Sequence, residues 1–174
     1  KPLLSLSGKP LQGLQGRGAE PHSFISIQTL PAIKEAFIDE RVEREEDYLI
    51  SLVSDIQEIL KVARLKPGKI YLYTADTETE QWKWEIFKAL RDVPEKDRIK
   101  EALKLRKDKS TVDFVNQLVK SNLDYFELEE AKILERERGY LTKEFGCAIG
   151  INENYDPKGK KRFAIPLKPA IYVE

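Results

Sequence analysis

A long amphipathic helix with a Pro-Gly stop is the feature that most constrains the fold of this 174-residue chain. Acidic side chains crowd the start of the segment from Asp39 to Lys66, where the helix dipole favours them, and basic side chains crowd its end. Pro67-Gly68 then ends the pattern. The spacing predicts a helix of roughly 25 residues, whose apolar stripe is Leu49, Leu52, Val53, Ile56, Ile59, Leu60 and Ala63.

Shorter elements follow this helix. Residues 69–75 alternate β-branched and aromatic side chains and predict a strand. Helical spacing recurs in 81–90, 95–107, 110–122 and 127–145, with a Ser/Thr cap expected at the start of the third and Gly146 capping the last. Residues 147–152 and 161–167 flank the Asp-Pro and Gly loop 153–160, which is a hairpin signal, and 170–173 can add one more short extended segment.

This order predicts an α+β fold class. A long N-terminal helix leads into a small mixed β-sheet covered by several helices, with a C-terminal β-hairpin. Three segments are expected: an irregular linker or tag-like tail at 1–24, a segment with the long helix at 25–66, and a domain at 67–174. The sequence contains no methionine, which indicates a fragment, a processed form or an edited chain.

Charge is unevenly distributed although the formal net charge is zero. Residues 35–58 carry a net charge of −7, while residues 95–109 and 156–174 each carry +3 before the terminal carboxylate is counted. A neutral total can therefore hide a basic face suited to a polyanion. The alternative is a set of solvated helix faces.

Most classes of catalytic site are excluded because the sequence lacks the residues that they need. The single histidine, His22, lies in the predicted tail, and the single cysteine, Cys147, is expected to be a small core residue. One of each is too few for a zinc site, and Asp76 to Glu80 lack the spacing of a calcium loop, so no metal is expected. Glu129-Glu130 is spaced for a solvated helix face. The sequence therefore favours a binding module over an enzyme. Because a single cysteine cannot form an internal disulfide, a reducing compartment is expected.

Four stretches, taken in order, carry a resemblance to a known family. They are "DERVEREEDYLISLVSDIQEILKVARLKPGKIYLYTA", "WKWEIFKAL", "YFELEEAKILERERGYLTKEFGC" and "DPKGKKRFAIPLKPAIYVE". Over residues 24–174 the chain resembles the C-terminal region of archaeal-type leucyl-tRNA synthetases, and residues 25–66 look like the segment leaving that family's anticodon-binding helical domain.

The resemblance implies a parent that is a class I, ATP-dependent leucine–tRNA ligase of the cytoplasm. The family's HIGH-like and KMSKS-like motifs are absent from these 174 residues, so the chain itself is expected to be non-catalytic and to need no cofactor. Its implied partners are leucine tRNA and the rest of the parent synthetase, with no membrane and no DNA. In this family the extreme C-terminal peptide helps to recognise the long variable arm of leucine tRNA.

The basic residues near the C-terminus are typical of phosphate contacts. Pro166 and Pro169 stiffen the last peptide, Tyr172 offers a stacking face, and Glu174 offers acceptors for base amino groups. The predicted RNA-binding residues are Lys158, Lys160, Lys161, Arg162, Lys168, Ala170, Ile171, Tyr172, Val173 and Glu174, with a second patch at Lys104, Lys107 and Lys109.

Two alternatives remain open for this peptide. Ile171, Tyr172 and Val173 can form a last strand that seals the core, which is compatible with RNA binding because alternate strand residues face opposite sides. The apolar tail can instead dock on another protein or on the rest of the parent enzyme, which makes the chain a protein-interaction module.

The two tryptophans are expected to face different ways on their helix. Trp82 takes the core face, so Trp84 either stacks on RNA or packs on a neighbouring domain. Lys83 and Lys88 are expected to be solvated, and Arg106 either joins the second basic patch or lines the buried edge of its helix.

Overall fold

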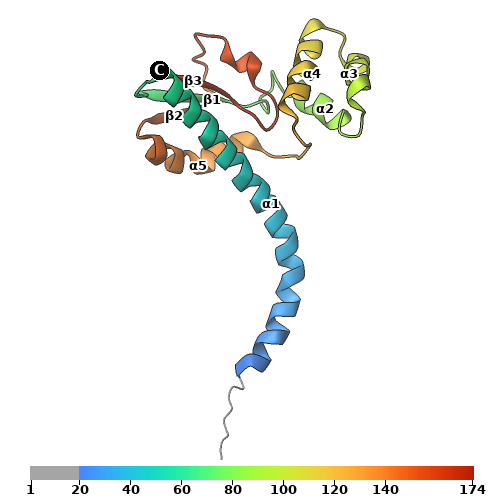
Figure 1. Cartoon of the computed structure of the whole chain (residues 1–174), viewed down its shortest axis with the longest axis vertical. Helices are drawn as coiled ribbons and strands as arrows, with labels where there is room; N and C mark the ends of the chain where they lie inside the picture. The colour runs from blue at the N-terminus through green and yellow to red at the C-terminus, as the bar shows by residue number, and fades with distance from the viewer. Residues whose placement is uncertain (1–19) are drawn as a thin grey trace, which may run out of the picture. The chain divides into compact units, whose positions relative to one another are not determined.

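The computed structural model describes the backbone from residue 20 onward and the side chains from residue 40 onward (Figure 1). The predicted tail at 1–24 therefore lies largely outside the described residues. The chain divides into two compact units, residues 1–44 and residues 45–174. All contacts described below belong to the second unit.

The predicted α+β fold class is confirmed, with a long helix followed by a strand, further helices and a small mixed sheet. The first helix begins earlier than its acidic turns suggested, at Glu20. The elements are α1 (Glu20–Ala63), β1 (Lys69–Tyr73), α2 (Trp82–Ala89), η2 (Glu95–Asp97), α3 (Arg98–Leu105), α4 (Lys109–Ser121), α5 (Glu130–Phe145), β2 (Ala148–Ile151), η3 (Lys160–Phe163) and β3 (Ala170–Val173).

β1 is the central strand of the sheet. It pairs in parallel with β2, where Ile70 lies opposite Ile149, and antiparallel with β3, where Tyr71 lies opposite Tyr172. One sheet face is buried under α1 and α5 (Figure 1). The apolar side chains that form this core are Tyr48, Leu52, Ile56, Ile70, Leu72, Leu128, Ile133, Leu134, Leu141, Cys147, Ile149 and Ile151.

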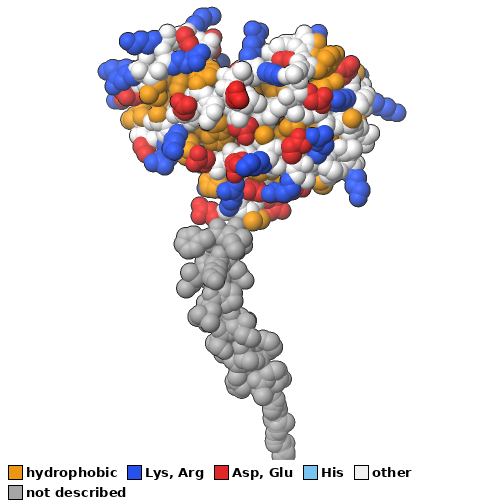
Figure 2. All heavy atoms as spheres, turned by 180° about the vertical axis from the view of Figure 1, so that it is seen from behind, with side chains coloured by type: hydrophobic (Ala, Val, Ile, Leu, Met, Phe, Trp, Pro, Cys, Tyr) orange, Lys and Arg blue, Asp and Glu red, His pale blue; other side chains and the backbone are white. Residues whose placement is uncertain are grey.

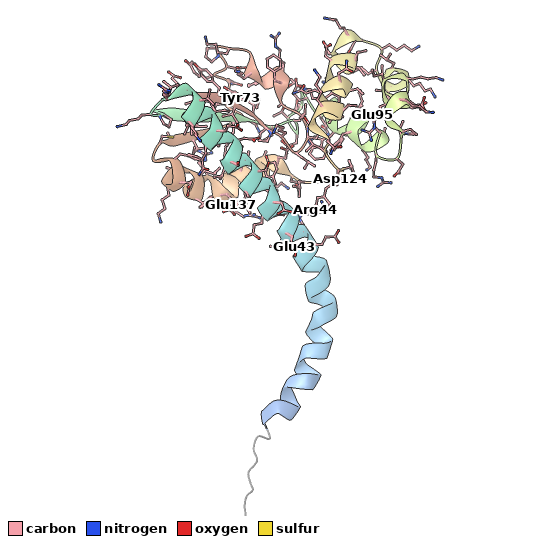
Figure 3. The ribbon with its side chains drawn as sticks, in the orientation of Figure 1. Glu43, Arg44, Tyr73, Glu95, Asp124 and Glu137 are labelled. Carbon is pink, nitrogen blue, oxygen red and sulfur yellow. The ribbon has the colours of Figure 1, made fainter. Side chains whose placement is uncertain are left out.

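Helices α2, α3 and α4 form a second apolar cluster. Figure 3 shows Tyr73 in the sheet, Glu137 on α5, and Glu95 and Asp124 in the region of α2 to α4. Asp108 rather than Ser110 caps α4, since its carboxylate accepts the N–H of Thr111 at 2.8 Å. The cluster consists of Ile86, Phe87, Leu90, Ala102, Phe114, Val115, Leu118 and Ile165, so it also binds the segment that leads to β3.

The predicted C-terminal hairpin is wrong. Residues 148–151 do form a strand, but they pair with β1 instead of with 161–167. The four residues after Gly159, Lys160–Phe163, wind into η3, and between η3 and β3 the chain forms the isolated Ile165–Lys168 bridge. Pro166 inside this bridge has no N–H to donate, and Leu167 has a φ of +66°, so the segment turns tightly and cannot extend a ladder.

The last four residues before Glu174 complete the sheet as β3. The backbone is fixed at its end, where the carbonyl of Glu174 accepts the N–H groups of Gly68 at 2.7 Å and Lys69 at 3.0 Å. The expectation that Gly146 caps α5 is confirmed, with a φ of +65°. Within the part of the chain that the structure describes, no helix is long and apolar enough to cross a membrane.

Candidate nucleic-acid interface

The C-terminal strand presents different side chains to its two sides. Ile171 and Val173 pack against the core under α1 and α5, while Tyr172 packs against Tyr71 on the opposite sheet face. The sealing-strand interpretation is therefore confirmed for Ile171 and Val173. Tyr172 is half-buried and Glu174 is exposed, so these two side chains remain within reach of a ligand.

A cluster of tyrosines lies on that opposite face of the sheet. Tyr71 has its ring centroid 5.1 Å from that of Tyr155 and 5.8 Å from that of Tyr172. Tyr155 is 46% exposed, and loss of solvent, followed by the charge of Glu174, raises the pKa of its phenol. The cluster is a partly exposed aromatic surface of the kind on which unpaired bases stack.

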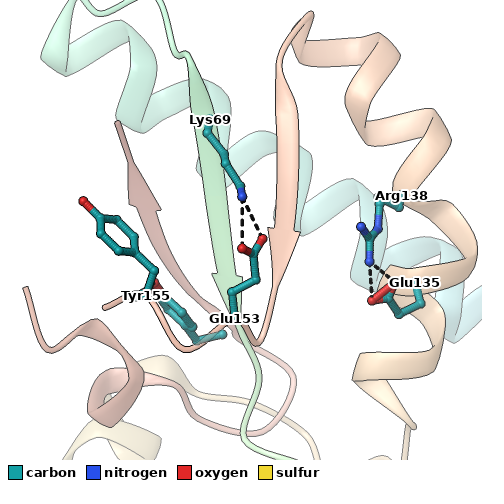
Figure 4. Close-up of polar contacts among 6 residues, drawn as sticks. Lys69, Glu135, Arg138, Glu153 and Tyr155 are labelled. Atoms are coloured by element: carbon teal, nitrogen blue, oxygen red, sulfur yellow. Dashed lines mark hydrogen bonds and ion pairs between the residues drawn. The ribbon is translucent and has the colours of Figure 1, made fainter. Parts of the chain in front are cut away.

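A cation and its partner border the tyrosine cluster. Lys69 Nζ lies 4.8 Å from the Tyr71 ring centroid. It also contacts both carboxylate oxygens of Glu153, at 2.9 and 3.0 Å (Figure 4). The hydrogen bond to Glu153 raises the pKa of Lys69. Of the three tyrosines in this cluster, only Tyr172 is predicted from the sequence to contact RNA. The alternation of Lys69, Tyr71 and Tyr73 in β1 was the available signal, because residues two apart share a sheet face.

The predicted basic run lies in a loop whose backbone is fixed. The carboxylate of Asp156 accepts the N–H groups of Lys160 at 2.6 Å and Lys161 at 2.9 Å, at the start of η3. Lys158 and Arg162 are exposed, and Lys160 and Lys161 are half-buried. Lys161 Nζ also lies 5.7 Å from the ring centroid of Tyr73.

Tyr73 connects this loop to the sheet. Its hydroxyl donates to the carbonyl of Tyr155, and burial, followed by the charge of Asp156, raises its pKa to about 12. Tyr73 therefore stays neutral over the ordinary pH range and keeps its hydrogen bond.

Lys83 is a buried anchor for the same loop, so the expectation that it is solvated is wrong. Its Nζ donates to the carbonyls of Arg162 at 2.8 Å and Ala164 at 2.6 Å, and it pairs with Glu80 at 2.5 Å. A lysine loses its hydration when buried and so needs such partners. No local sequence pattern indicates the loop that covers Lys83.

The remaining predicted residues occupy three other places. Lys104 of α3 pairs with Glu101 at 2.7 Å, while Lys107 in the loop before α4 and Lys109 at the start of α4 are exposed. Lys168 Nζ pairs with Asp55 of α1 at 2.8 Å, which ties the turn before β3 to that helix. Ala170 is buried in the sheet.

Arg106 and Arg162 bring the two basic segments to one groove. Both side chains line a hollow between α2, α4 and η3. Arg106 is exposed, with its guanidinium 4.4 Å from the Trp82 ring centroid, so it does not line a buried helix edge. Elsewhere, cations and anions are interspersed on the face drawn in Figure 2.

Trp84 packs inside this domain. It is half-buried, with its ring 6.0 Å from Phe87 and 6.5 Å from Tyr125 between centroids. Neither a neighbouring domain nor RNA is needed to cover most of it. Trp82, expected in the core, is also half-buried and makes an edge contact with Phe114 at 5.4 Å.

Glu130 is fully buried, so the expectation of a solvated helix face is wrong for this residue. Its carboxyl group accepts the hydroxyl of Tyr48 at 2.9 Å and the N–H of Leu167 at 3.2 Å. Burial raises the pKa of Glu130 to about 8. The carboxyl group of Glu130 on α5 thus links Tyr48 of α1 to Leu167 in the segment before β3.

The remaining polar residues have structural roles. Asp76 caps α5 by accepting the N–H of Ala131 at 3.0 Å. Cys147 is a core residue, as expected, and burial raises the pKa of its thiol. Across the described residues, no group of three or more His, Cys, Asp or Glu side chains is placed to hold a metal ion.

Comparison with known proteins identifies the relatives of this chain, although no family model matches it. It is 39% identical over 159 residues to a leucine–tRNA ligase of Methanocaldococcus jannaschii, 37% over 161 residues to that of Pyrococcus abyssi, and 36% over 158 residues to that of Methanococcus maripaludis. Each match covers 87% of this chain and 16% of the relative's length. The resemblance of this chain to the C-terminal region of archaeal-type leucyl-tRNA synthetases is thereby confirmed.

Proposed function

We propose that this chain is the non-catalytic C-terminal tRNA-binding domain of an archaeal-type leucyl-tRNA synthetase. Its partners are then leucine tRNA and the rest of the parent enzyme, which is an ATP-dependent ligase of the cytoplasm. It recognises the long variable arm of that tRNA with β3 and the basic loop before it. In this proposal, residues 25–66 are the segment that leaves the anticodon-binding helical domain, and residues 67–174 are the tRNA-recognition domain.

One observation carries the proposal. On one side of β3, the partly buried Ile171 and Val173 pack against the core. On the other side, the half-buried Tyr172 and the exposed Glu174 lie beside the exposed Tyr155. A strand held in the sheet loses little conformational entropy when RNA docks. The cations of residues 158–162 supply phosphate contacts, which position RNA, while stacking on tyrosines engages unpaired bases.

The same observation weakens the protein-docking alternative. That alternative required an apolar tail open to a partner, but the apolar side chains Ile171 and Val173 are packed against the core of this chain. Removing residues 171–174 also removes a paired strand, so deletion should lower stability as well as recognition. A test must therefore change side chains and leave the backbone in place.

Replacing Tyr172 by Ala tests the assignment. In gel-shift titrations, we expect Tyr172→Ala to weaken binding of a long-armed leucine tRNA by roughly 5- to 150-fold, the loss of one stacked base. The same tRNA with its variable arm shortened should bind wild type and variant alike.

Two comparisons make this result specific. Tyr172→Phe keeps the ring and should bind like the wild type, and thermal melts should show that the Ala variant remains folded. An equal loss of affinity for both RNAs would refute variable-arm recognition by β3, and salt-insensitive capture of a protein in place of RNA would favour the docking alternative.

A further inference from the structure

A groove lies between α2, α4 and η3, separate from the tyrosine cluster. Its volume of about 720 Å³ falls in the range of roughly 300–1,000 Å³ that is typical of small-ligand sites. It combines aromatic rings, guanidinium groups, carboxylates and a side-chain amide. The lining residues that matter to the argument are Trp82, Arg106, Asp113, Gln117, Arg162 and Phe163.

Phe163 is held at the rim of the groove by an unusual set of contacts. It is 48% exposed, yet three successive carbonyls around it accept side-chain hydrogen bonds. Lys83 Nζ binds those of Arg162 and Ala164, and the amide of Gln117 binds that of Phe163 at 3.0 Å. A buried lysine is thus used to fix a backbone that carries a solvent-facing aromatic ring. Such fixed placement of a side chain is typical of a preorganised binding site.

Two pairs of flat groups line the groove. Arg106 lies 4.4 Å from the Trp82 ring centroid, and Arg162 lies 4.8 Å from the Phe163 ring centroid. Both tryptophan and phenylalanine rings can stack on a nucleobase, and guanidinium groups can stack on it or pair with its phosphate. Asp113, which pairs with no described residue, can accept a hydrogen bond from a base amino group.

We propose that this groove binds a single unpaired nucleobase of RNA, stacked on Phe163 and Trp82 with its phosphate beside Arg162. This subsite rests on the proposed function and adds a second contact to that of β3. It explains why each of the two basic segments, 104–109 and 158–162, contributes one arginine, Arg106 or Arg162, to the lining of one hollow. Free nucleotides carry the same base and phosphate, so the test includes one.

The test uses Trp82 as its own reporter. The chain has two tryptophans, and Trp84→Phe leaves Trp82 as the only indole. In this 174-residue variant, we expect leucine tRNA to quench the emission of Trp82. Adding Phe163→Ala should weaken tRNA binding by roughly 5- to 150-fold, the loss of one stacked base, and reduce the quench.

Tyr140→Ala is the matched control, because Tyr140 is 49% exposed on α5, away from the groove lining. It should change neither affinity nor quench. If Trp84→Phe fails to fold, gel shifts of Phe163→Ala and Tyr140→Ala in the otherwise unchanged chain give the same comparison.

The outcomes separate the subsite from the proposed function. If the chain binds tRNA and Lys158→Gln with Lys160→Gln weakens that binding, but Phe163→Ala binds like the wild type, the groove assignment is overturned and the proposed function stands. If AMP quenches Trp82 at the concentrations at which tRNA does, the groove is a free-nucleotide site and the RNA assignment is overturned. If no tRNA binds the chain, both are overturned.

Discussion

Glu130 shows how a single buried carboxyl group makes the stability of the domain depend on pH. Its pKa is about 8 in the folded chain because of burial, and near 4.3 in an unfolded one. Between these values the folded state binds more protons than the unfolded state, so the free energy of unfolding falls as pH rises. Each pKa unit corresponds to about 1.4 kcal/mol, so we expect a loss of a few kcal/mol between pH 5 and pH 8.

Glu130→Gln should remove that dependence, because an amide does not titrate. Its one oxygen can accept the N–H of Leu167 while its NH2 group donates to the hydroxyl of Tyr48, which can accept as well as donate. Urea unfolding at pH 5, 6, 7 and 8 measures it. The neighbouring Glu129→Gln is the control, since its side chain is exposed and it should keep the wild-type pH dependence. The same pH dependence in Glu130→Gln as in the wild type would rule out Glu130 as its source.

Among the residues whose side chains are described, the buried acidic or basic residues are Glu130 and Lys83, and local sequence patterns do not predict the burial of either one. Periodicity assigns a face to each helix position, but Glu130 and Lys83 are buried by segments far away in the sequence, around Leu167 and around Arg162. No local pattern signals such partners. Cys147 was predicted well because its small apolar character alone decides its place.

At the scale of elements, Lys83 determines whether the basic loop keeps its shape. In Lys83→Met the carbonyls of Arg162 and Ala164 lose their donor and Glu80 loses its cation. Removing one partner of a buried ion pair costs about 3–5 kcal/mol. We expect that loss of stability in denaturant titrations, together with faster trypsin cleavage at residues 160–162.

Lys88→Met is the matched control for that experiment. Lys88 lies on the same helix and is exposed, so Lys88→Met should change the free energy of unfolding by no more than about half a kcal/mol. The trypsin cleavage rate at residues 160–162 should then stay at the wild-type value. Equal trypsin cleavage rates in the two variants would show that the loop is held by something other than Lys83.

Element types were more predictable than strand pairings. The helices at 81–90, 95–107, 110–122 and 127–145 follow from local periodicity and appear as α2 to α5. The hairpin failed because the strand at 148–151 has a better partner, the central strand β1, which is about eighty residues earlier in the chain. The basic and aromatic character of the C-terminal segment was readable, whereas the groove around Phe163 depends on tertiary packing.

At the scale of the whole molecule, a formal net charge of zero means that RNA attraction must come from local cations. If the two basic segments contact one RNA, replacing Lys107 and Lys109 by Gln, or Lys158 and Lys160 by Gln, should each lower the salt dependence of tRNA affinity. Each lost phosphate contact lowers the slope of log affinity against log salt by roughly 0.7–0.9, and the two pairs should add. Titrations between 50 and 200 mM salt, roughly the range over which such contacts weaken strongly, measure it. Replacing Lys132 and Lys143, exposed on α5, is the control of equal charge; a slope change as large as that of the other pairs would mean that binding follows total charge and not these two segments.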